Sequence, residues 1–100
     1  MTVHTIASGV TNQWGYGRTL ARDSTGRLWT TYLQAVDGFD EVFAAYSDDD
    51  GANWTAEQVT AIGDWQESPA IAVDSADNVH LVWNGYGWGE NAGYSNVQYR

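Results

Sequence analysis

Aromatic rings and short polar side chains gather in four segments of the chain, 7–17, 34–40, 63–68 and 84–95. A flat ring can stack on the C–H surface of a sugar, while amides and carboxylates bind its hydroxyl groups. Exposed aromatic clusters are typical of binding surfaces. We therefore expect a carbohydrate site in or beside these segments, with Gln66 among its polar side chains. Its candidate ligand-binding residues are Trp14, Tyr16, Arg18, Phe39, Trp65, Glu67, Tyr86, Trp88, Glu90 and Asn91.

Some of these rings have a second interpretation as packing residues. Trp14 and Trp65 occupy matching positions of an internal repeat, where they could instead wedge between structural units. Tyr86 and Trp88 lie in a glycine-rich stretch, where they could contact a ligand, pack within the loop or contact another subunit. Exposure on a loop favours the ligand, because loops on a rigid scaffold commonly carry binding residues.

The internal repeat organises the elements that must position these residues. Segment 21–28 aligns with segment 72–79, and the same offset of 51 positions pairs Leu20 with Ile71. Short strand-forming runs between turn residues predict four strands in the first unit and three in the second. Their expected ranges are 18–22, 27–33, 41–47 and 57–62, then 69–73, 79–83 and 96–100. The period is close to the roughly 40–50 residues of one propeller blade.

A fourth strand for the second unit is expected at the N-terminus, where residues 2–6 resemble residues 58–62. The sequence therefore predicts residues 1–100 as a single all-β unit of two four-stranded propeller blades. Blade one spans about 14–62. Blade two spans about 65–100 and is completed by residues 1–6 of a neighbouring chain.

Two blades cannot close a ring alone, since propellers have about 4–8 blades. A head-to-tail contact between copies closes a ring when the rotation fits. The sequence thus predicts a homo-oligomer, with a six-bladed trimer favoured over an eight-bladed tetramer. An excised or designed piece of a longer propeller is the alternative.

One turn carries a specific motif. Ser47-Asp48-Asp49-Asp50-Gly51-Ala52-Asn53-Trp54 matches the pattern S-x-D-x-G-x-x-W. A carboxylate in such a turn accepts backbone N–H groups, and glycine supplies a backbone angle that other residues resist. The motif resembles the Asp-box, or BNR repeat, of the sialidase-like β-propeller family. This resemblance implies a hairpin between two blade strands, with structural roles for Ser47, Asp49, Gly51 and Trp54.

The resembled family includes sialidases, other glycosidases, lectin-like proteins and receptors, so the motif leaves function open. A sialidase needs three arginines, a Tyr–Glu nucleophile pair and an acid aspartate. This chain has four basic residues, and only Arg18, in Tyr16-Gly17-Arg18, stands near the family's first arginine position. Arg18 could bind an anion or pair with Asp64 or Glu67. We assign no catalytic residue.

Charge and composition limit the classes of partner and ligand that we expect for this chain. Thirteen acidic residues against four basic ones give a net charge of -9, which repels phosphate backbones and anionic membranes. No nucleic acid or membrane partner is therefore expected. The aspartates at 48–50 are contiguous rather than spaced like calcium ligands, so neither a metal nor a cofactor is expected. The chain has no cysteine and suits either redox compartment.

The leading hypothesis is a non-enzymatic, lectin-like propeller that binds a glycan and assembles with copies of itself. Repeated weak sites on one ring would raise avidity without new contacts. Two alternatives stay open. One is a sialidase-type glycoside hydrolase or a degenerate fragment of one, and the other is a self-assembling scaffold without a ligand.

Overall fold

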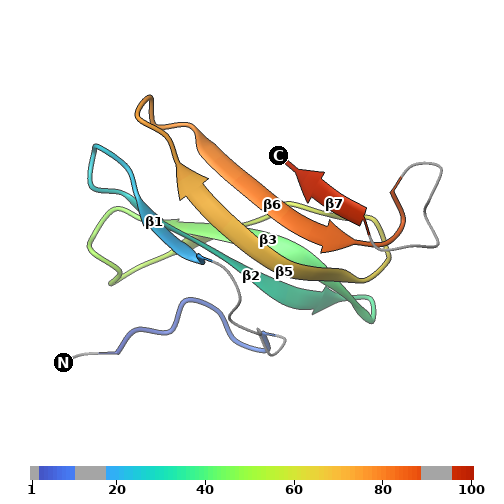
Figure 1. Ribbon diagram of the computed structural model, residues 1–100. Helices are drawn as coiled ribbons and strands as arrows, with labels where there is room; N and C mark the ends of the chain where they lie inside the picture. Colours follow the sequence, from blue (N-terminus) through green and yellow to red (C-terminus); the bar gives the residue numbers. More distant parts are fainter. Residues whose placement is uncertain (1–2, 11–17, 89–95) are drawn as a thin grey trace.

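The computed structural model describes residues 3–10, 18–88 and 96–100, and these form two antiparallel sheets (Figure 1). Sheet 1 contains, in spatial order, β1 (Leu20–Arg22), β2 (Leu28–Val36), β3 (Phe39–Ser47) and β4 (Thr55–Gln58). Sheet 2 contains β5 (Gln66–Val73), β6 (Val79–Gly85) and β7 (Asn96–Tyr99). The expected all-β class is confirmed, as are the positions of all seven strands within a few residues. Across these ranges no helix is long and apolar enough to span a membrane.

The turns that follow β1 and β5, at equivalent positions of the sequence repeat, have the same construction. Oδ1 of Asp23 and Oδ1 of Asp74 each accept the backbone N–H groups two and four residues further on, at 2.9–3.0 Å. The fourth residue of each turn has a positive φ, 92° at Gly26 and 64° at Asp77. A carboxylate that organises its own turn in this way is an Asx-type motif.

The connection between β2 and β3 is tighter than the sequence analysis expected. Val36 pairs with Phe39, and only Asp37 (φ 52°) and Gly38 (φ 88°) form the turn. An Asp-Gly pair with two positive φ angles matches the right-handed twist of a hairpin. The expected loop at 34–40 is therefore wrong, because most of it is strand, and Phe39 lies on β3 rather than on a loop.

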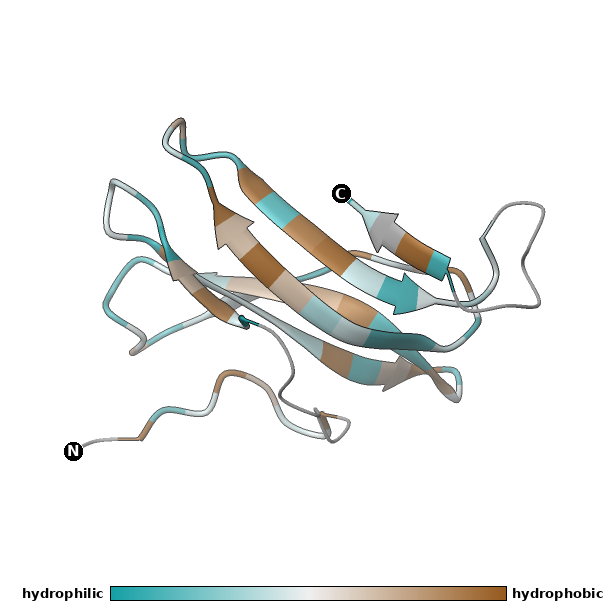
Figure 2. Ribbon diagram, viewed as in Figure 1, coloured by the Kyte–Doolittle hydropathy of each residue, from teal (hydrophilic) through white to brown (hydrophobic). Residues whose placement is uncertain are grey.

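The core lies between the two sheets. Alternating residues of β2 and β3 pack against alternating residues of β5 and β6, as expected for sheets that each have one buried face. Figure 2 shows apolar residues along β5 and β6, the two strands of sheet 2 that contribute to this core. The buried cluster comprises Leu33, Val42, Ala44, Ile71, Leu81 and Trp83.

The connections divide between two ends of the molecule (Figure 1). The turns that join β1 to β2, β3 to β4 and β5 to β6 lie at one end, which we call the turn end. Residues 37–38, 59–65 and 86–88 lie at the other, which we call the loop end. Antiparallel meanders require this division, and the sequence analysis had grouped the same connections together.

The N-terminal segment belongs to neither sheet. Residues 3–9 form no strand, and Val10 makes one isolated bridge with Gln34. Residues 4–7 and Val10 lie over Thr30 and Tyr32 of sheet 1, with a cavity of about 320 Å³ between them. Within the described residues, β7 is paired on one side only, with β6. The expected exchange of residues 1–6 between copies stays a prediction.

Candidate functional site

Trp65 and Phe39 form an aromatic pair at the loop end. Their ring centroids are 5.5 Å apart and their planes meet at 69°, an edge-to-face contact. Phe39 is half-buried, whereas 46% of Trp65 is exposed. The Trp65 N–H donates to Oδ1 of Asp64 at 2.8 Å, and the Trp65 carbonyl accepts the N–H of Tyr86 at 3.0 Å. An exposed ring is thus held on a fixed backbone.

Gln66, the next residue, is fully buried and holds the loop end together. Its Oε1 accepts the indole N–H groups of Trp83 at 3.1 Å and Trp88 at 3.0 Å. Its Nε2 donates to the carbonyls of Asp64 at 3.0 Å and Tyr86 at 3.1 Å. Every hydrogen-bonding position of the amide is therefore satisfied, as burial of a polar group requires. The expectation that Gln66 faces a ligand is wrong, because none of its side chain is exposed.

Gly85 makes room for that amide. A Cβ at position 85 would lie 1.9 Å from Oε1 of Gln66 and 2.6 Å from its Cδ. Any side chain there would displace Gln66 from its four partners. Glycine at this position is a packing requirement, since the position has no unusual φ.

Glu67 and Asn84 lie beside the aromatic pair. They are register partners on β5 and β6, and Nδ2 of Asn84 donates to Oε2 of Glu67 at 3.2 Å. Trp65, immediately before β5, and Glu67, on β5, are both exposed, while Gln66 between them is buried. The arrangement combines an exposed ring, a carboxylate and an amide.

Arg18 precedes β1 and is exposed. Its carbonyl accepts the N–H of Ile71 at 2.8 Å, which ties the start of β1 to β5. The expected ion pair between Arg18 and Asp64 or Glu67 is absent from the described part of the chain. Both carboxylates hydrogen-bond elsewhere, to the Trp65 N–H and to the Asn84 amide.

The structure divides the remaining candidates. Trp88 packs edge-on against Trp83 at 6.1 Å and its indole N–H donates to Gln66, as the loop-packing interpretation expects. Its ring is partly exposed, and contact with a ligand stays a prediction. Tyr86 is half-buried at the edge of the loop end. Four candidates lie outside the described residues: Trp14, Tyr16, Glu90 and Asn91.

The turn that carries the S-x-D-x-G-x-x-W pattern, residues 47–54, is at the turn end, on the hairpin between β3 and β4. Ser47 Oγ donates to Oδ1 of Asp49 at 2.8 Å and accepts the Gly51 N–H at 2.9 Å. Asp49 also accepts the Asn53 side chain at 2.7 Å and its N–H at 2.8 Å, and these bonds with Asn53 lower the pKa of Asp49 to about 2. The Trp54 indole N–H donates to the Gly51 carbonyl at 2.9 Å.

The neighbouring aspartates have separate partners. Asp48 receives two hydrogen bonds from Arg27, at 2.8 and 3.0 Å, and Asp50 pairs with Arg22 at 3.0 Å. Each carboxylate of the acidic run therefore faces a different group instead of a common centre. Among the described residues no group of three His, Cys, Asp or Glu side chains is placed to hold a metal ion.

A buried carboxylate that the sequence analysis missed fixes the connection between β4 and β5. Glu41 is 1% exposed and accepts the Thr60 hydroxyl and the N–H groups of Ile62 at 3.1 Å and Gly63 at 2.8 Å. Thr60 Oγ1 in turn accepts the Val42 N–H at 2.9 Å. Three donors satisfy the charge that burial would otherwise penalise. Trp65 is therefore anchored from both directions along the chain.

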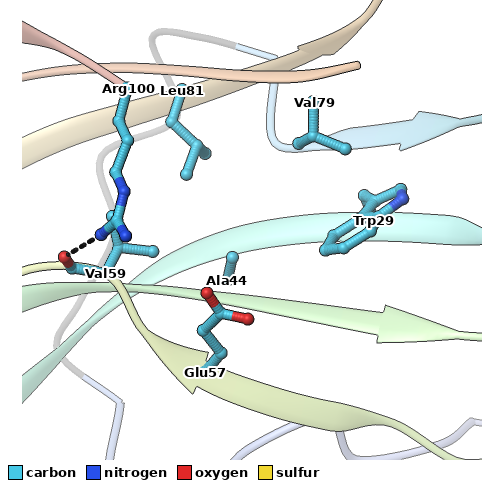
Figure 3. A pocket seen from close by; sticks show the side chains of 7 residues that line it. All are labelled: Trp29, Ala44, Glu57, Val59, Val79, Leu81 and Arg100. Atoms are coloured by element: carbon cyan, nitrogen blue, oxygen red, sulfur yellow. Dashed lines mark hydrogen bonds between the residues drawn. The ribbon is translucent and has the colours of Figure 1, made fainter. Parts of the chain in front are cut away.

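A second cavity, of about 170 Å³, lies between the sheets on the side of β4 and the C-terminus. Its walls are mostly apolar, and its one basic side chain, Arg100, donates to the Val59 carbonyl at 2.8 Å (Figure 3). In Figure 3 the carboxyl group of Glu57 lies away from the hydrogen bond between Arg100 and Val59. We attribute this cavity to incomplete packing where the sheets diverge. Its lining residues are Trp29, Ala44, Glu57, Val59, Val79, Leu81 and Arg100.

Comparison of the chain with models of known protein families, with curated proteins and with solved structures gave no match. The resemblance to Asp-box proteins therefore depends on the residues of this chain alone.

Proposed function

We propose that the two sheets are two blades of an Asp-box propeller, that copies of the chain complete the ring as a trimer, and that its loop end binds a glycan without catalysis. The observation that carries the glycan proposal is the half-exposed Trp65, held against Phe39 at the end where the connections gather. Repeating the same site in each copy would give multivalent binding.

The chemistry of this end suits a sugar. The exposed indole face of Trp65 offers a flat apolar surface for sugar C–H groups, and indole is the largest aromatic surface that a side chain provides. Glu67 accepts hydrogen bonds from hydroxyls, and Asn84 both donates and accepts them. The anchors of Gln66 and Glu41 reduce the entropy that ordering the site would otherwise require on binding.

The positions of the carboxyl groups whose pKa is shifted favour binding without catalysis. The carboxylates with a lowered pKa in the described part of the chain are Asp23, Asp49 and Asp74. All three organise turns at the turn end, and active-site acids are expected at the ligand instead. Glycoside hydrolysis further needs two carboxyl groups facing the scissile bond.

A glycan array followed by calorimetric titration of the best ligand tests this proposal. Trp65→Ala is expected to weaken binding at least tenfold, about 1.4 kcal/mol, because the stacking surface is lost. Trp54→Phe, an aromatic change at the opposite end, is the control and should bind normally. A flat array would refute the glycan ligand, and unchanged affinity in Trp65→Ala would refute the site.

A further inference from the structure

The two sheets pack on each other through non-equivalent faces. Sheet 2 buries Ile71, Leu81 and Trp83 against sheet 1, with exposed fractions of 2%, 7% and 4%. Sheet 1 receives them on the face that carries Ala21 and Trp29. The contact is therefore head to tail, because the two repeated units contribute opposite faces to it. Each sheet keeps one face that the contact within the chain does not use.

The repeat shows what the unused faces are. The equivalents of Ile71, Leu81 and Trp83 in sheet 1 are Leu20, Thr30 and Tyr32. These three lie on the face of sheet 1 that points away from sheet 2; we call it the sheet 1 outer face. It corresponds to the face that sheet 2 buries within the chain.

Sheet 2 has the complementary surface. The equivalents of Ala21, Trp29 and Thr31 are Ala72, His80 and Val82. These residues point away from sheet 1 and form, with Ala70 and Tyr99, the sheet 2 outer face, which is hollowed over an apolar area. Val82 is 42% exposed and Tyr99 is 68% exposed, so this apolar surface has no cover in the described part of the chain.

We propose that the sheet 2 outer face docks on the sheet 1 outer face of a second copy and repeats the packing that joins the two sheets within one chain. This inference rests on the ring in the proposed function and gives that ring its contact surface. Each copy supplies the face that the other lacks, so the contact is heterologous and can propagate to a closed ring. The hydrogen bond from Ile71 N–H to the Arg18 carbonyl has a repeat equivalent from Leu20 N–H to the Pro69 carbonyl of the second copy.

Charge favours the same surfaces. The chain has a net charge of -9, so copies repel one another over most of their surface. The sheet 1 outer face carries only Leu, Thr and Tyr at the three equivalent positions, and the sheet 2 outer face carries no carboxylate among its five residues. These eight residues carry no acidic side chain, so copies of an acidic chain can approach closely there.

The N-terminal segment lies on the sheet 1 outer face, where Thr30 and Tyr32 are buried and Leu20 is 54% exposed, but the segment's own apolar side chains pack poorly. Its apolar residues Val3, Ile6 and Val10 are 85%, 37% and 37% exposed, and the cavity of about 320 Å³ lies beneath it. A docking sheet would bury more apolar surface than this segment does, so the segment would be displaced.

Native mass spectrometry of the 100-residue chain, without glycan, tests the contact. The wild-type chain is expected to form a ring, and Val82→Asp and Leu20→Asp are each expected to abolish it, because each places a charge in one face. Both residues are exposed in the chain, so each variant monomer should stay folded, with the same far-ultraviolet circular dichroism spectrum as Ala52→Asp. That control adds the same charge on the Asp-box hairpin and should assemble normally.

Mixing the two variants distinguishes a head-to-tail contact from a symmetric one. Val82→Asp keeps an intact sheet 1 outer face and Leu20→Asp keeps an intact sheet 2 outer face, so the mixture should form a heterodimer and nothing larger. A monomeric wild-type chain, full assembly of Leu20→Asp, or no heterodimer in the mixture would each overturn the proposal. None of these readouts uses a sugar, so failure here leaves the Trp65 titration to decide glycan binding separately.

Discussion

At the scale of single residues, two buried polar side chains govern the loop end. Gln66 and Glu41 are 0% and 1% exposed, and both are fully hydrogen-bonded. Because an unpaired buried polar group is destabilising, such groups fix one arrangement of their partners. The partners here are backbone groups on either side of Trp65. The amide of Gln66 and the carboxyl group of Glu41 therefore fix the position of the exposed ring.

Gly85→Ala is expected to lower the free energy of unfolding by about 1–3 kcal/mol, because the added methyl group overlaps Oε1 of Gln66. Chemical denaturation of the chain and its variants measures this. Gln66→Ala should also destabilise the chain, since it leaves the indole N–H groups of Trp83 and Trp88 without their acceptor.

The double variant Gln66→Ala/Gly85→Ala provides the control for a direct clash. With the amide removed, the methyl group at position 85 has space, so the two effects should be clearly less than additive. Strict additivity would show that Gly85 is needed for a reason other than its contact with Gln66.

The same residues show what the sequence could predict at this scale. The Asp-box roles of Ser47, Asp49, Gly51 and Trp54 were predictable, because a local turn is set by residues a few positions apart. The burial of Gln66 and Glu41 was not, because their partners come from strands and connections far along the chain. Trp65 and Trp88 look alike as loop tryptophans, and only the position of the Gln66 amide separates the exposed ring from the packed one.

At the scale of elements, the turns are where sequence and structure agree best. The carboxylates of Asp23, Asp49 and Asp74 each organise their own turn. These turns mark where the flanking strands end and begin. The predicted strand ranges failed chiefly at the loop end, where β2 and β3 continue to the Asp37-Gly38 turn. The polar residues there favour a loop by composition, whereas their backbone groups pair across the hairpin.

These turns should make stability depend on acid pH. The folded pKa of Asp49 is about 2, against an ordinary value of 3.8, chiefly through its bonds from Asn53. The pKa of Asp74 is lowered further, chiefly by its bond with the His80 side chain. A lowered folded pKa contributes stability that is fully present above about pH 4 and is lost as the pH falls through the folded value. We therefore expect the thermal midpoint to fall steadily between about pH 4 and pH 2.

Asp49→Asn tests the contribution of the Asp-box to that fall. The variant should be less stable than the wild-type chain near neutral pH and should lose less of its thermal midpoint on acidification. Asp50→Asn is the matched control, since Asp50 makes only an exposed ion pair with Arg22. Parallel pH profiles for Asp49→Asn and the wild-type chain would contradict this account.

At the scale of the whole molecule, the two sheets use one face each for their contact. The equivalent face of sheet 1 lies under the N-terminal segment, and that of sheet 2 is exposed at Val82 and Tyr99. The repeat could be read from the sequence because its turns and strands recur 51 positions apart. The face that each sheet buries could not, since both faces of β5 and β6 carry apolar residues. The packing of Ile71, Leu81 and Trp83 on sheet 1 settles which faces remain.

The N-terminal segment provides the last test of the ring. Residues 3–6 pair with no strand of their own chain, and β7 is paired on one side only within the described residues. If these two edges meet between copies, deleting residues 1–6 removes the strand that completes sheet 2. The face-to-face contact would remain without the main-chain hydrogen bonds of the added strand. We expect native mass spectrometry of the truncated chain to show smaller species at concentrations where the full chain forms a ring. An unchanged mass distribution would refute strand exchange and leave the docked faces as the sole contact between copies.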